Sequence, residues 1–172
     1  MGAHPTAAEI IQLLDLQPLA GEGGYFRQTL FVPNEPDAPG GNPLATAIVF
    51  LVSPTSWSGL HRLVTDELFH FYLGDPCRMV VCSPDGVLEE RCLGTNLRSG
   101  CRIQTLVPGG HWQGTMLHPD GEFGYALLGT TMTPGFRQDQ FTLATETDLA
   151  ALPESVAGRL QPFLAANQEQ PG

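Results

Sequence analysis

The stretch HRLVTDELFHFYLGD, residues 61 to 75, combines two of the five histidines with an adjacent acidic pair and three aromatic residues. Apolar or aromatic residues fill most of 67–73 and the run ends at Gly74, so this pattern predicts a β-strand. Side chains alternate between the two faces of a strand, so one acid shares a face with two aromatic rings: Glu67, Phe69 and Phe71. His70 lies on the opposite face, as a structural residue or at a subunit contact.

Glu67 has two interpretations. As an acid at a strand end it is solvated and inert, which is the usual place for such a residue. As an acid that faces aromatic rings inside a barrel it is costly to bury, unless a metal, a histidine or a substrate pairs with it. His61 is the nearest candidate partner in the sequence.

Short strands separated by turns every eight to twelve residues favour an all-β barrel or sandwich. The strands are predicted at 25–31, 44–52, 67–73, 78–83, 88–93, 101–107, 112–117 and 125–132. The second of these is nearly continuous in apolar residues, which predicts burial on both faces. Helices are predicted at 7–14, with Thr6 as N-cap, and at 147–165 with an interruption at Pro153. Residues 34–43 are predicted to form a loop, and 166–172 a frayed polar end.

The chain length of 172 residues predicts one domain over 1–172, with the barrel at about 22–145 and a C-terminal helical tail at 146–172. The net charge is −10, with eight arginines and no lysine. This composition argues against nucleic-acid binding through a basic patch and excludes lysine Schiff-base chemistry.

The four cysteines show no Cys-x-x-Cys pair, so they are predicted to be reduced thiols in a reducing compartment: Cys77, Cys82, Cys92 and Cys101. No leader-like segment opens the chain and no apolar run is long enough to cross a bilayer. We therefore expect a cytoplasmic protein without a membrane partner.

Two spacing patterns in the chain resemble those of the cupin superfamily. The first cupin motif has histidine, histidine, glutamate and glycine at set intervals, and the corresponding residues are His61, Leu63, Glu67 and Gly74. The second has proline, glycine and histidine, and the corresponding residues are Pro108, Gly110 and Gln113. Leu63 and Gln113 thus replace two of the four usual metal ligands, so the standard three-histidine, one-glutamate site cannot form from these positions.

More specifically, residues 9 to 145 resemble the fifth cupin family, a group of largely unknown function. The blocks that carry this resemblance are EGGYFRQT at 22–29, ATAIVFLV at 45–52, HRLVTDELFHFYLGD at 61–75, LG at 93–94, VPGGHWQG at 107–114 and TPGF at 133–136. The resemblance implies an all-β, RmlC-like fold, the cupin double-stranded β-helix or jelly-roll barrel, with an N-terminal helix and a C-terminal helical segment. It also implies a homodimer.

General acid–base chemistry is the first functional hypothesis. A histidine whose tautomer and basicity are set by a carboxylate suits proton abstraction next to a carbonyl. His61 would be the base, Glu67 its orienter, and Tyr25 or Tyr125 the partnering acid. This set is similar to that of the metal-free sugar-nucleotide epimerases of the same superfamily, which implies an isomerase or epimerase acting on a sugar-like or carbonyl substrate.

Two alternatives remain open at this level. A metal-dependent oxygenase or lyase would hold iron, nickel, manganese or zinc with His61, Glu67 and either Gln113 or His111. A non-catalytic protein would bind a small molecule at a barrel mouth lined by aromatic side chains: Phe69, Phe71, Trp112 and Tyr125. In either case Gln113 and Arg27 are candidate substrate contacts, although Arg27 is equally suited to an ion pair with Glu22.

Overall fold

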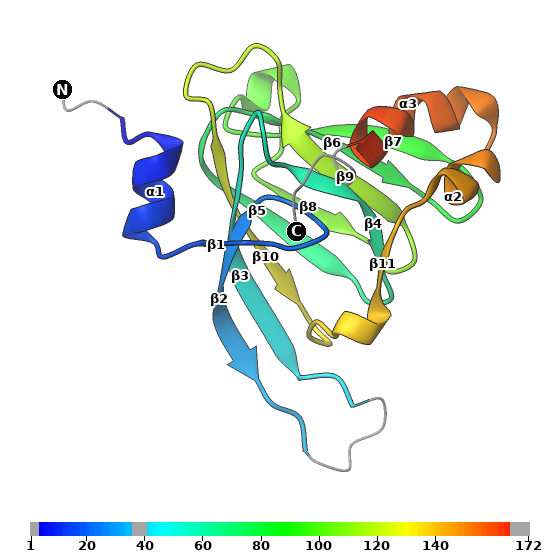
Figure 1. Cartoon of the computed structure of the whole chain (residues 1–172), viewed down its shortest axis with the longest axis horizontal. Helices are drawn as coiled ribbons and strands as arrows, with labels where there is room; N and C mark the ends of the chain where they lie inside the picture. Colours follow the sequence, from blue (N-terminus) through cyan, green and yellow to red (C-terminus); the bar gives the residue numbers. More distant parts are fainter. Residues whose placement is uncertain (1–3, 36–40, 166–172) are drawn as a thin grey trace.

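The computed structural model describes residues 4–35 and 41–165, and within them two antiparallel sheets pack face to face (Figure 1). The first sheet has the order β1 (Gln17–Pro18), β2 (Tyr25–Val32), β3 (Ala45–Val52), β10 (Ala126–Met132), β5 (Glu67–Gly74) and β8 (Gln104–Val107). The second has the order β11 (Phe141–Leu143), β4 (Ser58–Leu63), β9 (Trp112–Leu117), β6 (Cys77–Cys82) and β7 (Leu88–Leu93). The predicted all-β cupin fold is confirmed.

The main core lies between the two sheets and is built from alternate residues of their strands. In β5 the predicted alternation is present: Glu67, Phe69 and Phe71 are buried, whereas Tyr72 on the other face is exposed. Met79 and Val81 of β6 contribute from the opposite sheet. One face of β5 therefore points into the interior, as predicted.

The strand β3 departs from its prediction over its first half. Phe50, Leu51 and Val52 are fully buried, but Leu44 is exposed and Ala45, Ala47 and Ile48 are only partly buried. The hairpin of β2 and β3 extends beyond the rest of the sandwich (Figure 1), so the second sheet does not cover its far end. An apolar run therefore did not mean burial on both faces throughout.

The N-terminal helix α1 (Ala7–Leu13) begins at Thr6, which forms a capping box with Glu9 as predicted. Its buried residue Ile10 packs on the outer face of the first sheet, against Leu51 and Leu127. The helix thus covers part of a face that the second sheet cannot reach.

The predicted C-terminal helix is two helices, α2 (Glu146–Ala150) and α3 (Glu154–Ala165), divided at Pro153. The helix α3 packs on the outer face of the second sheet, where Phe163 contacts the β9 strand. A Cβ atom on Gly114 would come within 2.8 Å of the Phe163 ring, so only glycine permits this close packing.

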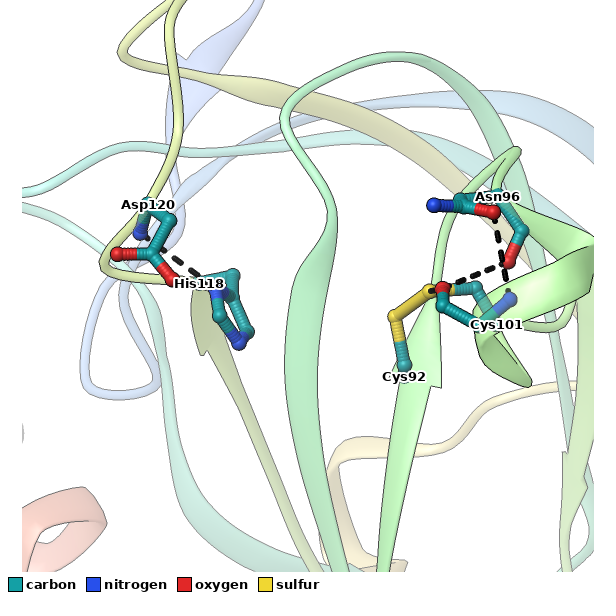
Figure 2. Close-up of a disulfide and its surroundings, with 6 residues drawn as sticks. Cys92, Asn96, Cys101, His118 and Asp120 are labelled. Carbon is teal, nitrogen blue, oxygen red and sulfur yellow. Dashed lines mark hydrogen bonds and ion pairs between the residues drawn. A yellow bond between two sulfur atoms is a disulfide. The ribbon is translucent and has the colours of Figure 1, made fainter.

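Cys92 and Cys101 form a disulfide, so the prediction of four reduced thiols is wrong for this pair (Figure 2). The bond joins β7 to the segment before β8, across the short 3₁₀ helix η1 (Leu97–Ser99), and Figure 2 shows Asn96 beside it. The strand predicted at 101–107 begins only at Gln104, as β8, so Cys101 precedes it. Cys77 and Cys82 are free and buried, as thiols.

Two predicted segments fall partly or wholly outside the described residues. The predicted loop 34–43 lies partly outside them, at 36–40, and the predicted polar end 166–172 lies wholly outside. Among the residues that are described, no helix has the length and apolar character needed to span a bilayer.

Candidate functional site

A cavity of about 100 Å³ lies between the two sheets, and His61 and Glu67 both line it. Most of its wall is aromatic or aliphatic, from β2, β3, β5, β10 and the 136–141 segment: Phe26, Ile48, Phe50, Phe69, Met132, Phe136 and Phe141. The polar side chains in the wall are Glu22, Gln28, Thr46, His61, Glu67 and Thr130. A few polar groups in an apolar wall are typical of a small-molecule site.

His61 lies on β4 with 2% of its side chain exposed. Its Nδ1 atom is 2.8 Å from the carbonyl oxygen of Gly59, and because a carbonyl only accepts, Nδ1 carries the proton. The ring stacks on Phe141 with 5.2 Å between the centroids. In the neutral ring the lone pair is therefore on Nε2, which has no hydrogen-bond partner among the described residues.

Glu22 is a site residue that the sequence argument did not include. Its Oε1 atom accepts a hydrogen bond of 2.8 Å from the Ser58 hydroxyl and lies 3.9 Å from His61 Nδ1. The backbone holds the two segments together as well, because the Gly59 amide donates to the Glu22 carbonyl at 2.8 Å. Its signal in the sequence was its place at the head of the block EGGYFRQT, directly before paired glycines.

The turn after Glu22 needs glycine for a reason that the structure makes plain. Gly24 has a φ of 74°, in the left-handed region, and a Cβ atom there would approach the Phe50 ring to 2.6 Å. Its amide donates to the Ser56 hydroxyl at 2.9 Å. This turn fixes the Glu22 side chain at the cavity wall.

Glu67 is 7% exposed, and Gln113 Nε2 donates to its Oε2 atom at 2.7 Å. Burial raises the pKa of Glu67, and the nearby charge of Glu22 raises this pKa further. The charge of His61 and hydrogen bonds from Thr130 and Gln113 act in the opposite direction. The net effect is a carboxyl group that holds its proton to higher pH than an ordinary glutamate.

His61 is oriented differently from the prediction. Its Nδ1 hydrogen is bonded to a backbone carbonyl, with Glu22 as the nearest carboxylate. Glu67 instead lines the same cavity and interacts with His61 through charge. The orienting role expected for Glu67 thus belongs to the Gly59 carbonyl and Glu22.

Tyr25 and Tyr125, the proposed partnering acids, are not brought next to His61. Both belong to the cluster that packs with α1 on the outer face of the first sheet. Strand alternation explains this for β2, because Phe26 and Gln28 face the cavity and Tyr25 and Arg27 therefore face away. Arg27 is exposed and makes no ion pair with Glu22 in the described structure.

The predicted aromatic lining holds only in part. Phe69 lines the cavity, whereas Phe71 belongs to the core and does not reach the cavity wall. Trp112 lies on the outer side of the second sheet, packed with α3, and the Arg62 guanidinium sits 4.6 Å from its ring centroid. The alternation of β9 turns Gln113 inward and Trp112 outward.

The fold brings together too few donors for the predicted metal site. His61 and Glu67 converge, but the other two motif positions are Leu63 and Gln113, and the Gln113 amide already donates to the Glu67 carboxylate. His111 precedes β9, with Nδ1 3.3 Å from the Gly109 carbonyl oxygen, and does not line the cavity. Within the described residues no three histidine, cysteine or acidic side chains form a metal-binding group. These residues do not fit the usual cupin metal centre.

Comparison with known proteins places these features in a family. SO0799 from Shewanella oneidensis, known from its crystal structure, has 31% sequence identity and a TM-score of 0.83, over 93% of this chain and 98% of that chain. The uncharacterized protein YML079W from Saccharomyces cerevisiae is 28% identical over an alignment of 152 residues, and the match covers 79% of this chain and 76% of that protein.

A more distant likeness concerns the fold alone. Oxalate decarboxylase from Bacillus subtilis, a protein with Mn(II) centres, has 17% identity and a TM-score of 0.55, over 92% of this chain and 38% of that chain.

The family model described as "Cupin superfamily (DUF985)" matches residues 8–144. With most of its length matched, this chain belongs to the DUF985 family of the cupin superfamily.

Proposed function

We propose that this protein is an isomerase-type enzyme that moves a proton within a small carbonyl compound, with His61 as the base and Glu67 as the acid. The observation that supports this most is the pair of complementary groups in one cavity. His61 has its Nδ1 proton engaged and an Nε2 lone pair without a hydrogen-bond partner in the described part of the chain, whereas the raised pKa of Glu67 favours a protonated carboxyl group.

The proton transfers balance without a cofactor. His61 Nε2 removes a proton from the hydroxyl-bearing carbon next to the carbonyl, while Glu67 donates its proton to the carbonyl oxygen, which gives a neutral enediol. The protonated His61 then returns a proton to the neighbouring carbon. Glu67 recovers its proton from the hydroxyl group that becomes the new carbonyl. The apolar wall keeps water from quenching the intermediate.

The first experiment detects proton abstraction without knowledge of the product. The protein is incubated in D₂O with a panel of small hydroxycarbonyl and aminocarbonyl compounds, and loss of the proton next to the carbonyl is followed by NMR. We expect His61→Ala to slow exchange by about 10²–10⁴-fold, the usual contribution of a general base. His118→Ala is the matched control, because His118 does not line the cavity; it is 42% exposed and pairs with Asp120 (Figure 2).

Two outcomes would favour the other hypotheses. Saturable binding of a ligand with no exchange in any compound would make the protein a binding cupin without catalysis. Near-stoichiometric iron, nickel, manganese or zinc in protein purified without chelators, lost in His61→Ala, would favour a metal-dependent oxygenase or lyase.

A further inference from the structure

The cavity is lined by two acidic side chains and other hydrogen-bond acceptors, but by no arginine or lysine. Glu22 and Glu67 both line it, whereas none of the eight arginines, all in the described ranges, does so, and the sequence has no lysine. Because Glu67 is protonated in the proposed site, an anionic ligand would add a second negative charge beside that of Glu22 in a poorly solvated space, at a large cost in free energy. Phosphates and carboxylates are therefore poor candidates for this cavity.

Two acceptor atoms in the cavity wall are available to a hydrogen-bond donor. The Oε1 atom of Glu22 accepts from Ser58, but its Oε2 atom has no hydrogen-bond partner among the described residues. His61, 2% exposed, presents an Nε2 lone pair that is likewise unpartnered there. The carboxylate acceptor of Glu22 is matched by a group with several N–H donors and a positive charge, which leaves the His61 Nε2 lone pair for proton abstraction.

The aromatic wall favours the same chemistry. Phe26, Phe50, Phe69, Phe136 and Phe141 line the cavity, and the negative faces of aromatic rings attract an ammonium group. The net charge of −10 adds a long-range attraction for cations.

We propose that the substrate of this site carries a protonated amine, which pairs with Glu22 while its carbonyl group lies between His61 and Glu67. This assignment of a substrate class rests on the proposed function for the carbonyl, but the amine preference is a property of the cavity itself. Glu22 is thus a specificity-determining residue.

Binding of three probes of similar shape and different charge tests the proposal. Benzylamine, benzyl alcohol and benzoate are titrated into the protein at pH 7.5 and low salt, by calorimetry or NMR. We expect benzylamine to bind at least about tenfold more tightly than benzyl alcohol, which corresponds to about 1.4 kcal/mol, and benzoate to bind most weakly.

Two variants separate the local contact from the overall charge. Glu22→Gln should remove the preference for benzylamine and leave the affinity for benzyl alcohol within about twofold, because a neutral alcohol loses no ion pair. Glu122→Gln removes the same unit of charge on a residue that does not line the cavity, and should keep the preference. Equal affinity of the parent for amine and alcohol, or tightest binding of benzoate, would overturn the proposal.

The amine preference and the catalytic proposal fail separately. His61→Ala should still prefer benzylamine, because Glu22 remains. Proton exchange in hydroxycarbonyl compounds without an amine preference would refute only the substrate class. An amine preference without proton exchange would refute only the proposed catalytic function.

Discussion

Burial of the Glu67 carboxyl group in the proposed site lowers the stability of the folded protein above the ordinary glutamate pKa. Its carboxyl group is buried, and the pKa is raised first by that burial. The folded state therefore binds a proton at pH values where the unfolded chain, with an ordinary glutamate pKa of 4.5, has released it. The stability of the fold then falls as the pH rises from about 4.5 through the folded pKa of Glu67.

We predict that Glu67→Gln stabilises the protein above the folded pKa of Glu67, and not at pH 4, where the glutamate is protonated in both states. Each unit of raised pKa corresponds to about 1.4 kcal/mol. The measurement is urea unfolding of parent and variant at pH 4 and pH 8. If the difference in unfolding free energy between parent and variant were the same at pH 4 and pH 8, a raised pKa of Glu67 would be contradicted.

Glu89→Gln is the control of opposite sign. A hydrogen bond from Arg91 lowers the pKa of Glu89, so its contribution to stability is present above the unfolded pKa and lost as the pH falls through the folded one. The Glu89→Gln variant should be less stable than the parent at pH 8 and approach it in acid.

At the scale of elements, the connection between β7 and β8 shows what local patterns miss. Cys101 follows a polar turn and precedes a strand, and nothing in its neighbourhood distinguishes a thiol from half of a disulfide. The bond joins residues nine positions apart, with Cα atoms separated by 4.5 Å. It closes the loop around η1 and so restricts the unfolded chain.

The double variant Cys92→Ser/Cys101→Ser should lose about 2–3 kcal/mol of stability, from the chain-entropy cost of a loop of this length. Denaturant unfolding with and without dithiothreitol measures the loss, and the reductant should affect the parent but not the variant. Titration of the unfolded parent should find two thiols before reduction, from Cys77 and Cys82, and four after it. Four thiols before reduction would refute the bond.

At the scale of the whole molecule, the homodimer implied by the family resemblance stays a prediction. Light scattering on a size-exclusion column should give twice the chain mass of 18.5 kDa. A single-chain mass that does not change with protein concentration would contradict it. The expected cytoplasmic location likewise stays a prediction. The disulfide between Cys92 and Cys101 removes one of its supports, because four reduced cysteines were expected.

Local patterns in the sequence sufficed for the all-β fold class and for the centre of the site, but they did not predict the strands β1, β4 and β11. The alternation in 67–73 correctly turned Glu67 and Phe69 inward, and the motif spacing correctly brought His61 to the same cavity. The division at Pro153 and the Thr6 cap were also readable, because each depends on residues within one or two turns of chain.

The tertiary structure alone decided which strand faces turn inward elsewhere and which groups complete the site. Tyr25 and Phe26 are equally plausible interior residues until α1 covers one face of β2 and the second sheet covers the other. Glu22 reaches His61 across 39 positions of sequence, and Gln113 reaches Glu67 across 46. Periodicity is a property of neighbouring residues, whereas burial and pairing at these distances depend on how separate segments pack, so only the folded chain specifies them.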